Sequence, residues 1–395
     1  MKIALLNWSA GENDPFTPFN EKLKIEFERC GRDVVIVPLD ASFYQTISRL
    51  KDEGLDFVID WQGLGSQFCA PNSTHTIWDT LKIPHFCLHG DHPSQKIVNH
   101  RADRQYTRHL YIAGSYGRYA NRHLPRTHAA LTFKLPVLNT KKLNNKPDGA
   151  YFVLAKNVND LNTTMEAWKG RCEPILFDVL ASCVAGILDS LDSGAVTDHH
   201  AIVDDVLASV DFVEKIAPQF PSIDAKVFVT DIHSSMNYMY RDALSERIIQ
   251  EMHDFPVHVY GRGWDRYAAL KNPKHRFFSA LPAGDSESLF YSKFGILDVA
   301  PVFDWMHDRT LRSVECGSSF LTIGSHWPHV DLMGVNHGDV LFGNSMSSLA
   351  EKAQSIVLDP DTHLDRCKVF GGNYRRWASH FELLRTLELL RVQFG

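Results

Sequence analysis

The feature that most constrains the fold of this chain is the alternation of two residue periods along its first 90 positions. Short runs rich in β-branched and apolar residues, the pattern of buried strands, cover residues 2–8, 33–39, 56–61 and 85–90. Segments with helical spacing follow the first three runs, and Gly31 stands where a helix C-cap is expected. The alternation predicts a parallel sheet with helices on both faces and right-handed crossovers.

A second α/β alternation follows residues 217–222, a span with two prolines that ends an amphipathic helix expected over residues 201–216. Helices are expected between the strands of this second half and at the C-terminus. The predicted strands are residues 226–230, 257–260, 277–280, 295–300, 320–323 and 340–342.

We therefore predict an α/β protein with two doubly wound, Rossmann-like domains that face a central cleft. The length of 395 residues agrees with two domains. The first domain is predicted to span residues 1–220, with the C-terminal helix of residues 374–395 packing back on it. The second is predicted to span residues 221–373.

Charge and cysteine usage exclude several classes of protein. The 41 basic and 47 acidic residues give a net charge of −6, which argues against nonspecific duplex binding, so nucleic acid is not an expected partner. Seven cysteines without a C-x-x-C pair favour neither a disulfide scaffold nor a structural zinc site, and a reducing cytoplasm fits best. The longest apolar stretch, residues 179–188, is about half of what a bilayer-spanning helix needs. No transmembrane segment or signal peptide is expected.

Ligands of open α/β sheets bind beyond the carboxyl ends of strands, so the residues that follow each predicted strand are candidates. His89-Gly90-Asp91-His92 ends the fourth strand. A carboxylate between two imidazoles there can act as a general base, or the aspartate can simply cap a polar turn. Zinc binding by these residues is geometrically awkward at this spacing, and no metal site is expected.

Two further loops carry chemistry in the predicted second domain. Asp231 follows the strand expected at residues 226–230, where it could serve as nucleophile or base, unless the neighbouring serines only cap a helix. Gly261-Arg262-Gly263-Trp264 follows the strand at residues 257–260. Its glycines permit close backbone approach, Arg262 can pair with phosphate, and Trp264 can stack on a base or sugar. A dinucleotide fingerprint is excluded because Arg266 replaces the third glycine.

The densest group of polar residues lies between His307 and Ser319. A helix over residues 307–316 places Asp308, Arg312 and Glu315 on one face. Such a charged face is often only solvated, but here a Gly cap and a buried-type strand follow directly. We expect this helix beside the cleft.

Three motifs follow one another in the second half: Tyr260-Gly261-x-Gly263-Trp264, then Tyr291-Ser292-Lys293 before a strand, then His307-Asp308-Arg309-x-x-Arg312-x-x-Glu315-Cys316-Gly317-Ser318. This order resembles the CgeB-like (spore maturation protein-like) glycosyltransferases of GT-B fold, whose motif is approximately hdR-x-f-E-x-x-a-c-G followed by a strand. The Asp91-His92-Pro93 turn is similar to a turn in the first domain of that family. The resemblance covers residues 225–390 well and the first 100 residues loosely.

The resemblance implies transfer of a sugar from a nucleotide-activated donor to a glycan, lipid-linked or protein acceptor. The nucleotide would bind the C-terminal domain and the acceptor the N-terminal domain. No metal or cofactor is expected, because a helix N-terminus and basic side chains neutralise the leaving diphosphate. The candidates for that role are Arg262, Lys293, His307 and Arg309.

Two stereochemical courses stay open. In an inverting reaction, Asp91 or His92 would deprotonate the acceptor hydroxyl, assisted by His89. In a retaining reaction, Asp231 would reach the anomeric carbon and form a covalent adduct.

One departure from the family pattern leaves the donor open. Arg312 stands where the family has a carboxylate, five positions before Gly317, that commonly contacts ribose. Either Glu315 takes over this contact, or the extra cation serves an acidic donor such as a CMP-activated ulosonic acid of the Kdo or sialic type. Ser318 and Ser319 are similar to the paired hydroxyls with which sialyltransferase-like GT-B enzymes hold a CMP phosphate. Two different functions also stay open, those of a nucleotide-sugar epimerase and of a non-catalytic sugar-binding protein.

Arginines are frequent between residues 101 and 126, where they either dock the protein on a membrane or belong to a solvated helix pair. They are Arg101, Arg104, Arg108, Arg118, Arg122 and Arg126. The expected location is the cytoplasm, with peripheral contact to the inner membrane face left open.

Overall fold

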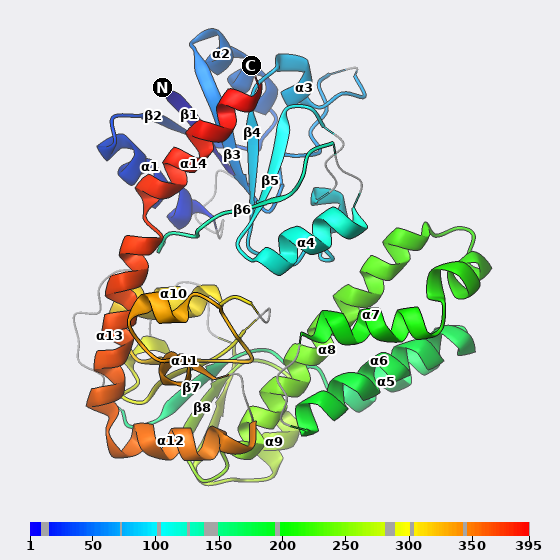
Figure 1. Cartoon of the computed structure of the whole chain (residues 1–395), viewed down its shortest axis with the longest axis vertical. Helices are drawn as coiled ribbons and strands as arrows, with labels where there is room; N and C mark the ends of the chain where they lie inside the picture. The colour runs from blue at the N-terminus through cyan, green and yellow to red at the C-terminus, as the bar shows by residue number, and fades with distance from the viewer. Residues whose placement is uncertain are drawn as a thin grey trace. The chain divides into compact units, whose positions relative to one another are not determined.

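The computed structural model consists of two compact α/β units (Figure 1). It describes residues 1–8, 16–71, 73–100, 104–124, 127–137, 149–193, 198–280, 289–300, 304–342 and 346–394. Unit 1 comprises Met1–Asn139 and Arg375–Gly395, and unit 2 comprises Thr140–Tyr374. The predicted α/β class with two doubly wound units is confirmed.

Unit 1 is built on a parallel sheet with the strand order β2-β1-β3-β4-β5-β6. Its strands are β1 (Lys2–Asn7), β2 (Asp33–Pro38), β3 (Leu55–Trp61), β4 (His85–His89), β5 (Thr107–Tyr111) and β6 (Leu131–Thr132). The first four agree with the predicted runs within one residue, because each is continuously apolar and bounded by turn residues. β5 and β6 were not predicted, since Thr107, Arg108 and His109 interrupt the apolar pattern.

Helices cover both faces of this sheet. They are α1 (Thr17–Arg29), α2 (Phe43–Asp52), α3 (Ile77–Leu81), α4 (Gly114–His123) and α14 (His380–Arg391). Gly31 adopts a φ of 76° directly after α1, as its expected role at the helix end requires. α14 packs against α1, so the prediction that the C-terminal helix returns to the first domain is confirmed (Figure 1).

Unit 2 contains a second parallel sheet with the order β12-β11-β10-β7-β8-β9. Its strands are β7 (Phe152–Ala155), β8 (Val257–Tyr260), β9 (His275–Phe278), β10 (Gly295–Val299), β11 (Phe320–Ile323) and β12 (Leu341–Phe342). Helices α9 (Asp265–Ala269), α10 (Asp308–Cys316), α11 (His337–Val340), α12 (Leu349–Leu358) and α13 (Pro360–Trp377) follow or connect them. β7 was not among the predicted strands.

Between β7 and β8 the chain forms a group of long helices that extends to one side of the unit 2 sheet (Figure 1). It contains α5 (Leu161–Lys169), α6 (Pro174–Asp192), α7 (His199–Ser209) and α8 (Ala225–Glu251). By length and composition, α6 could cross a membrane. Its Val179, Cys183 and Ile187 instead belong to the core that α6 shares with α7 and α8.

The strand predicted at residues 226–230 is wrong, because these residues form the start of α8. Asp224 caps this helix by accepting hydrogen bonds from the backbone N–H groups of Lys226 and Val227. Phe228, Val229 and Ile232 are buried at helical spacing, so tertiary packing overrides their strand propensity. The division between units at residues 139–140 therefore differs from the predicted boundary at residues 220–221, which lies inside unit 2.

Candidate functional site

The strand order of unit 2 reverses between β7 and β10. From β7 the chain adds β8 and β9 on one side, and then crosses to add β10, β11 and β12 on the other. In open parallel sheets, ligands bind beyond the C-terminal ends of the strands at such a reversal. The residues that follow β7 and β10, and the side chains that neighbouring elements place there, form the candidate site.

Helix α10 begins at this edge, with His307 as its N-cap. The His307 Nδ1 accepts a hydrogen bond from the backbone N–H of Arg309 over 3.2 Å. Asp298, buried on β10, accepts from both the backbone N–H and the hydroxyl of Thr310, over 3.1 and 2.7 Å. Its other carboxylate oxygen lies 3.7 Å from His307 Nδ1 and 3.7 Å from Arg309 Nη1. Asp298 thus fixes the first turn of α10 through Thr310, and its negative charge lies near His307 and Arg309 at the positive end of the helix dipole.

A second set of basic side chains reaches this edge from β7 and α8. Lys156 follows β7, and its Nζ lies 2.8 Å from a carboxylate oxygen of buried Asp242 on α8. The second oxygen of Asp242 accepts from the backbone and side-chain N–H groups of Asn159, over 3.1 and 2.9 Å. The Nε of neighbouring Arg241 is buried and has no hydrogen-bond partner among the described residues.

These basic groups form one electrostatic cluster. Burial lowers the pKa of Lys156, Asp242 opposes this, and the charges of Arg241 and Arg309 lower it further. Lys156 pairs with Asp242, Arg309 lies near Asp298, and Arg241 adds a third positive charge within electrostatic reach of Lys156. An excess of positive charge at the N-terminus of a helix is an arrangement that binds phosphate groups. We call Lys156, Arg241, His307 and Arg309 the cationic cluster.

Asp298 should be the main structural support of this cluster. We expect Asp298→Ala to lower the free energy of unfolding by about 1–3 kcal/mol, because two buried donors of Thr310 lose their acceptor. Urea unfolding of the full chain measures this change. Asp205→Ala, at an exposed position of α7, is the matched control and should leave stability near that of the wild type. Equal stability of the two variants would contradict the role assigned to Asp298.

The Gly261-Arg262-Gly263-Trp264 motif lies at the same edge but serves mainly to shape the backbone. A Cβ on Gly263, whose φ is 86°, would lie 1.8 Å from the Val158 carbonyl oxygen, so the glycine allows the loops after β7 and β8 to approach each other. Gly261 approaches Lys156 in the same way. Trp264 is 3% exposed and donates its indole N–H to the Lys156 carbonyl, so the structure contradicts its predicted stacking on a ligand. Arg262 is exposed.

Other predicted donor-binding residues lie toward the opposite edge of the sheet. Lys293 precedes β10, and Ser318 and Ser319 precede β11, so all three are at the N-terminal ends of parallel strands. Both serines are buried, and the Ser318 hydroxyl donates to the Phe290 carbonyl over 3.3 Å. The Arg312 guanidinium lies 5.6 Å from the Phe290 ring centroid.

The physical reason for this separation is that α10 runs from one edge of the sheet to the other. Glu315 stands in its last turn, directly before the cap at Gly317, which has a φ of 69°. The helix was predicted correctly. Each residue advances about 1.5 Å along the helix axis, however, so the two ends of the motif lie at opposite edges of the sheet. The motif from His307 to Ser319 is therefore not one site.

In unit 1, only one of the three predicted acid–base residues is exposed. Asp91 follows β4 and is exposed, and its backbone N–H donates to the Gln62 side chain over 3.3 Å. His92 is 1% exposed, and its Nδ1 lies 2.7 Å from the Ser94 hydroxyl. His89 is fully buried at the end of β4, within the predicted strand. Its predicted assistance to Asp91 or His92 stays a prediction.

Two further predictions change with the fold. Asp231 lies within α8, at an exposed position of the helix. A nucleophile was expected there because Asp231 was predicted to follow a strand, and the residues directly before it belong to α8 instead. Arg108 is 6% exposed on β5, with its guanidinium 4.0 Å from the Phe394 ring centroid, so it is not part of a basic surface. Arg101 and Arg126 lie outside the described residues.

Sequence reasoning missed Lys156, Arg241, Asp242 and Asp298. One signal was available for Asp298, a single acidic residue within the apolar run Gly295–Val299. Lys156 follows β7, a strand that was not predicted. Nothing local marks Arg241 and Asp242, because their position at the sheet edge depends on how α8 packs.

Comparison with known proteins gives matches among solved structures only. No protein-family model matches the chain. No curated protein matches it either. The fold is similar to that of phage T4 β-glucosyltransferase, with a TM-score of 0.49 and 10% identity over 98% of this chain and 99% of the other. A further structure of T4 phage BGT contains UDP and Mn²⁺, with a TM-score of 0.48, 11% identity and 100% coverage of both chains. HepE of Anabaena in complex with UDP-glucose has a TM-score of 0.47 and 10% identity, over 100% of this chain and 98% of that chain.

Proposed function

We propose that this chain is a glycosyltransferase that takes its sugar from a nucleotide-activated donor. The observation that carries the proposal is the cationic cluster at the strand-order reversal of unit 2. Arg309 stands in the first turn of α10, where backbone N–H groups are left without partners inside the helix, and Lys156 lies within electrostatic reach of both Arg309 and Arg241. A diphosphate is a ligand whose charge and size suit such a set of donors.

The chemistry follows from the charge that develops during transfer. As the bond between the anomeric carbon and the diphosphate oxygen breaks, negative charge builds on the leaving group. Arg309, His307 and the α10 N-terminus stabilise that charge, and Lys156 and Arg241 add to the positive field. Because these residues already supply the compensating charge, we propose that the reaction needs no divalent metal.

Asp91 is the proposed base for the acceptor. Its exposed carboxylate at the C-terminal end of the unit 1 sheet can accept the proton of an acceptor hydroxyl, which then attacks the anomeric carbon. A single base acting in this way gives inversion at the anomeric carbon. The acceptor class proposed is a glycan, a lipid-linked sugar or a protein, as the family resemblance implies.

Ligand-dependent thermal stability tests the proposal. Full-length protein is heated with UDP-, GDP-, dTDP- and CMP-sugars and with the free nucleotides. A ligand present at 100 times its Kd stabilises the native state by about 2.7 kcal/mol, so one nucleotide family should raise the melting temperature. The same shift should be lost in Arg309→Ala. Absence of any shift across the panel would contradict the proposed donor site.

A further inference from the structure

Unit 1 contains a row of polar side chains on one face of its sheet. His85, Cys87 and His89 alternate along β4, and by register Cys87 lies beside Asp60 of β3 and His109 of β5. Neighbours in register point to the same face of a parallel sheet. The intervening residues Phe86 and Leu88 are fully buried on the other face. A sheet covered on both faces normally carries apolar residues on both faces, because a buried polar side chain costs free energy unless it has a partner. This polar face is therefore a candidate binding site.

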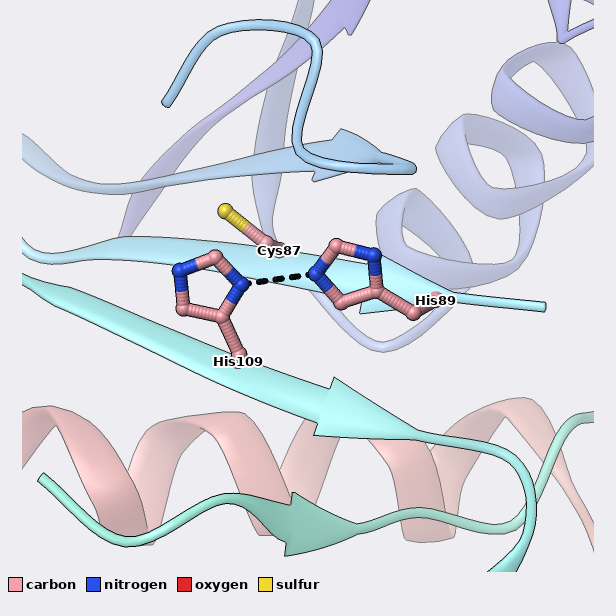
Figure 2. A group of neighbouring side chains, drawn as sticks. All are labelled: Cys87, His89 and His109. Atoms are coloured by element: carbon pink, nitrogen blue, oxygen red, sulfur yellow. Dashed lines mark hydrogen bonds between the residues drawn. The ribbon is translucent and has the colours of Figure 1, made fainter. Parts of the chain in front are cut away.

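Three of these side chains have the geometry of metal ligands. One ligand atom each of Cys87, His89 and His109 lies within 4.8 Å of the other two, and all three residues are buried (Figure 2). The His89 Nε2 and His109 Nδ1 are 2.7 Å apart. Figure 2 shows the two imidazoles and the thiol on the same side of β4 and β5. A thiolate with two imidazoles is a ligand set that favours zinc.

A zinc ion fits with a small adjustment of these side chains. Two imidazole nitrogens on a tetrahedral zinc at 2.0–2.1 Å stand about 3.3 Å apart, so His89 and His109 would separate by about 0.6 Å. Without metal, one imidazole donates its proton to the other. On metal binding each imidazole keeps one proton on its remote nitrogen, and the Cys87 thiol releases one proton.

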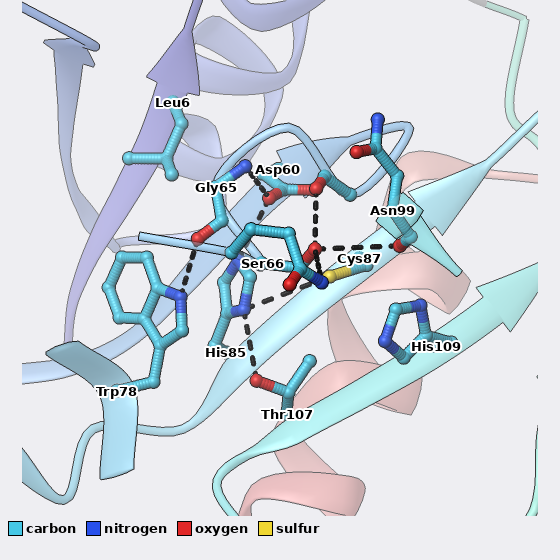
Figure 3. A network of polar contacts seen from close by, with 12 residues as sticks. Leu6, Asp60, Gly65, Ser66, Trp78, His85, Cys87, Asn99, Thr107 and His109 are labelled. Atoms are coloured by element: carbon cyan, nitrogen blue, oxygen red, sulfur yellow. Dashed lines mark hydrogen bonds and ion pairs between the residues drawn. The ribbon is translucent and has the colours of Figure 1, made fainter. Parts of the chain in front are cut away.

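A buried carboxylate next to Cys87 supports a cation at this place. Asp60 is fully buried, and its Oδ2 accepts from the Gly65 backbone N–H over 2.7 Å and lies 3.0 Å from His85 Nε2 (Figure 3). Its Oδ1 is buried and has no hydrogen-bond partner among the described residues. Ligand atoms of Asp60, His85 and Cys87 also lie within 4.8 Å of one another. A divalent ion bound by one thiolate keeps one positive charge, which the Asp60 carboxylate neutralises.

We propose that Cys87, His89 and His109 bind a zinc ion that links β4 to β5 inside unit 1, with Asp60 as the neutralising carboxylate beside it. This site is independent of the proposed donor site in unit 2. The ion would stabilise β4, the strand that Asp91 follows. Sequence spacing did not reveal it, because the ligands come from two strands that only the register brings together.

Metal analysis of the full-length chain tests this proposal. After dialysis against metal-free buffer, the wild type should retain an equimolar amount of zinc, whereas Cys87→Ser and His109→Gln should retain almost none. Cys183→Ser is the matched control and should keep its zinc. Burial raises the pKa of Cys183 to about 12, and the residue lies in the core of unit 2.

Replacement of zinc by Co²⁺ gives a second readout that does not need a folded variant. Wild-type protein with cobalt should show a thiolate-to-cobalt charge-transfer band, and chelator should remove the band and lower the melting temperature. If the wild type holds no more zinc than Cys87→Ser, or if cobalt-loaded wild type lacks the band, the site does not exist.

Discussion

Arg309→Ala should lower kcat/KM for sugar transfer by about 10²–10³-fold while the protein stays folded. Removal of one preorganised donor that stabilises developing negative charge has effects of this size. Arg309 lies in the first turn of α10, 3.7 Å from Asp298 and within electrostatic reach of Lys156. Steady-state kinetics with the donor found by thermal shift, together with the melting temperature of the variant, measure the effect.

Arg312→Ala is the matched control for this prediction. It removes the same side chain from the same helix, but Arg312 lies over Phe290 and away from the cationic cluster. We expect its rate to stay close to that of the wild type. Arg309→Lys should recover part of the loss, since it keeps the charge but not the planar fork of donors. A larger loss of kcat/KM in Arg312→Ala than in Arg309→Ala would indicate that the donor binds at the other end of α10.

Asp91→Asn should lower kcat by about 10²–10⁴-fold, because the amide cannot accept the acceptor proton. The donor affinity should not change, because Asp91 is proposed to act on the acceptor hydroxyl and not to bind the donor. Single-turnover transfer rates and the equilibrium affinity for the donor separate the two effects.

The matched control is Asp52→Asn, which makes the same change at an exposed position in the last turn of α2. It should transfer sugar at the wild-type rate. Full activity of Asp91→Asn would remove Asp91 from the mechanism. A weaker donor affinity without a change in kcat would assign it to binding rather than to proton transfer.

The sequence predicted those parts of the fold in which local pattern and tertiary environment agree. β1 to β4 are continuous apolar runs with turns at both ends, and α10 has a recognisable start at His307 and a glycine cap at Gly317. β5 was not predicted because polar residues interrupt its apolar pattern: Thr107 and His109 lie on the buried polar face of the sheet and Arg108 on the other face. Residues 226–230 were predicted as a strand because a β-branched run does not distinguish a strand from a buried helix.

The candidate site was predicted only in part, for a related reason. His307 and Arg309 stand at a strand-to-helix turn, which a sequence pattern can mark. Three other predicted residues could bind a phosphate by their side chains but precede β10 or β11: Lys293, Ser318 and Ser319. They therefore lie at the N-terminal edge of the sheet, opposite the candidate site. Arg241 and Asp242 reach the site through the packing of the 27-residue helix α8, which no local pattern encodes.

The proposed donor site is best tested by a crystal structure with the nucleoside diphosphate that gives the largest thermal shift. We expect the diphosphate to lie at the amino end of α10, within hydrogen-bond distance of Arg309, with Lys156 and Arg241 beside it. A diphosphate bound near Arg312, Lys293 and Ser318, at the other edge of the unit 2 sheet, would show that the donor site is not at the cationic cluster.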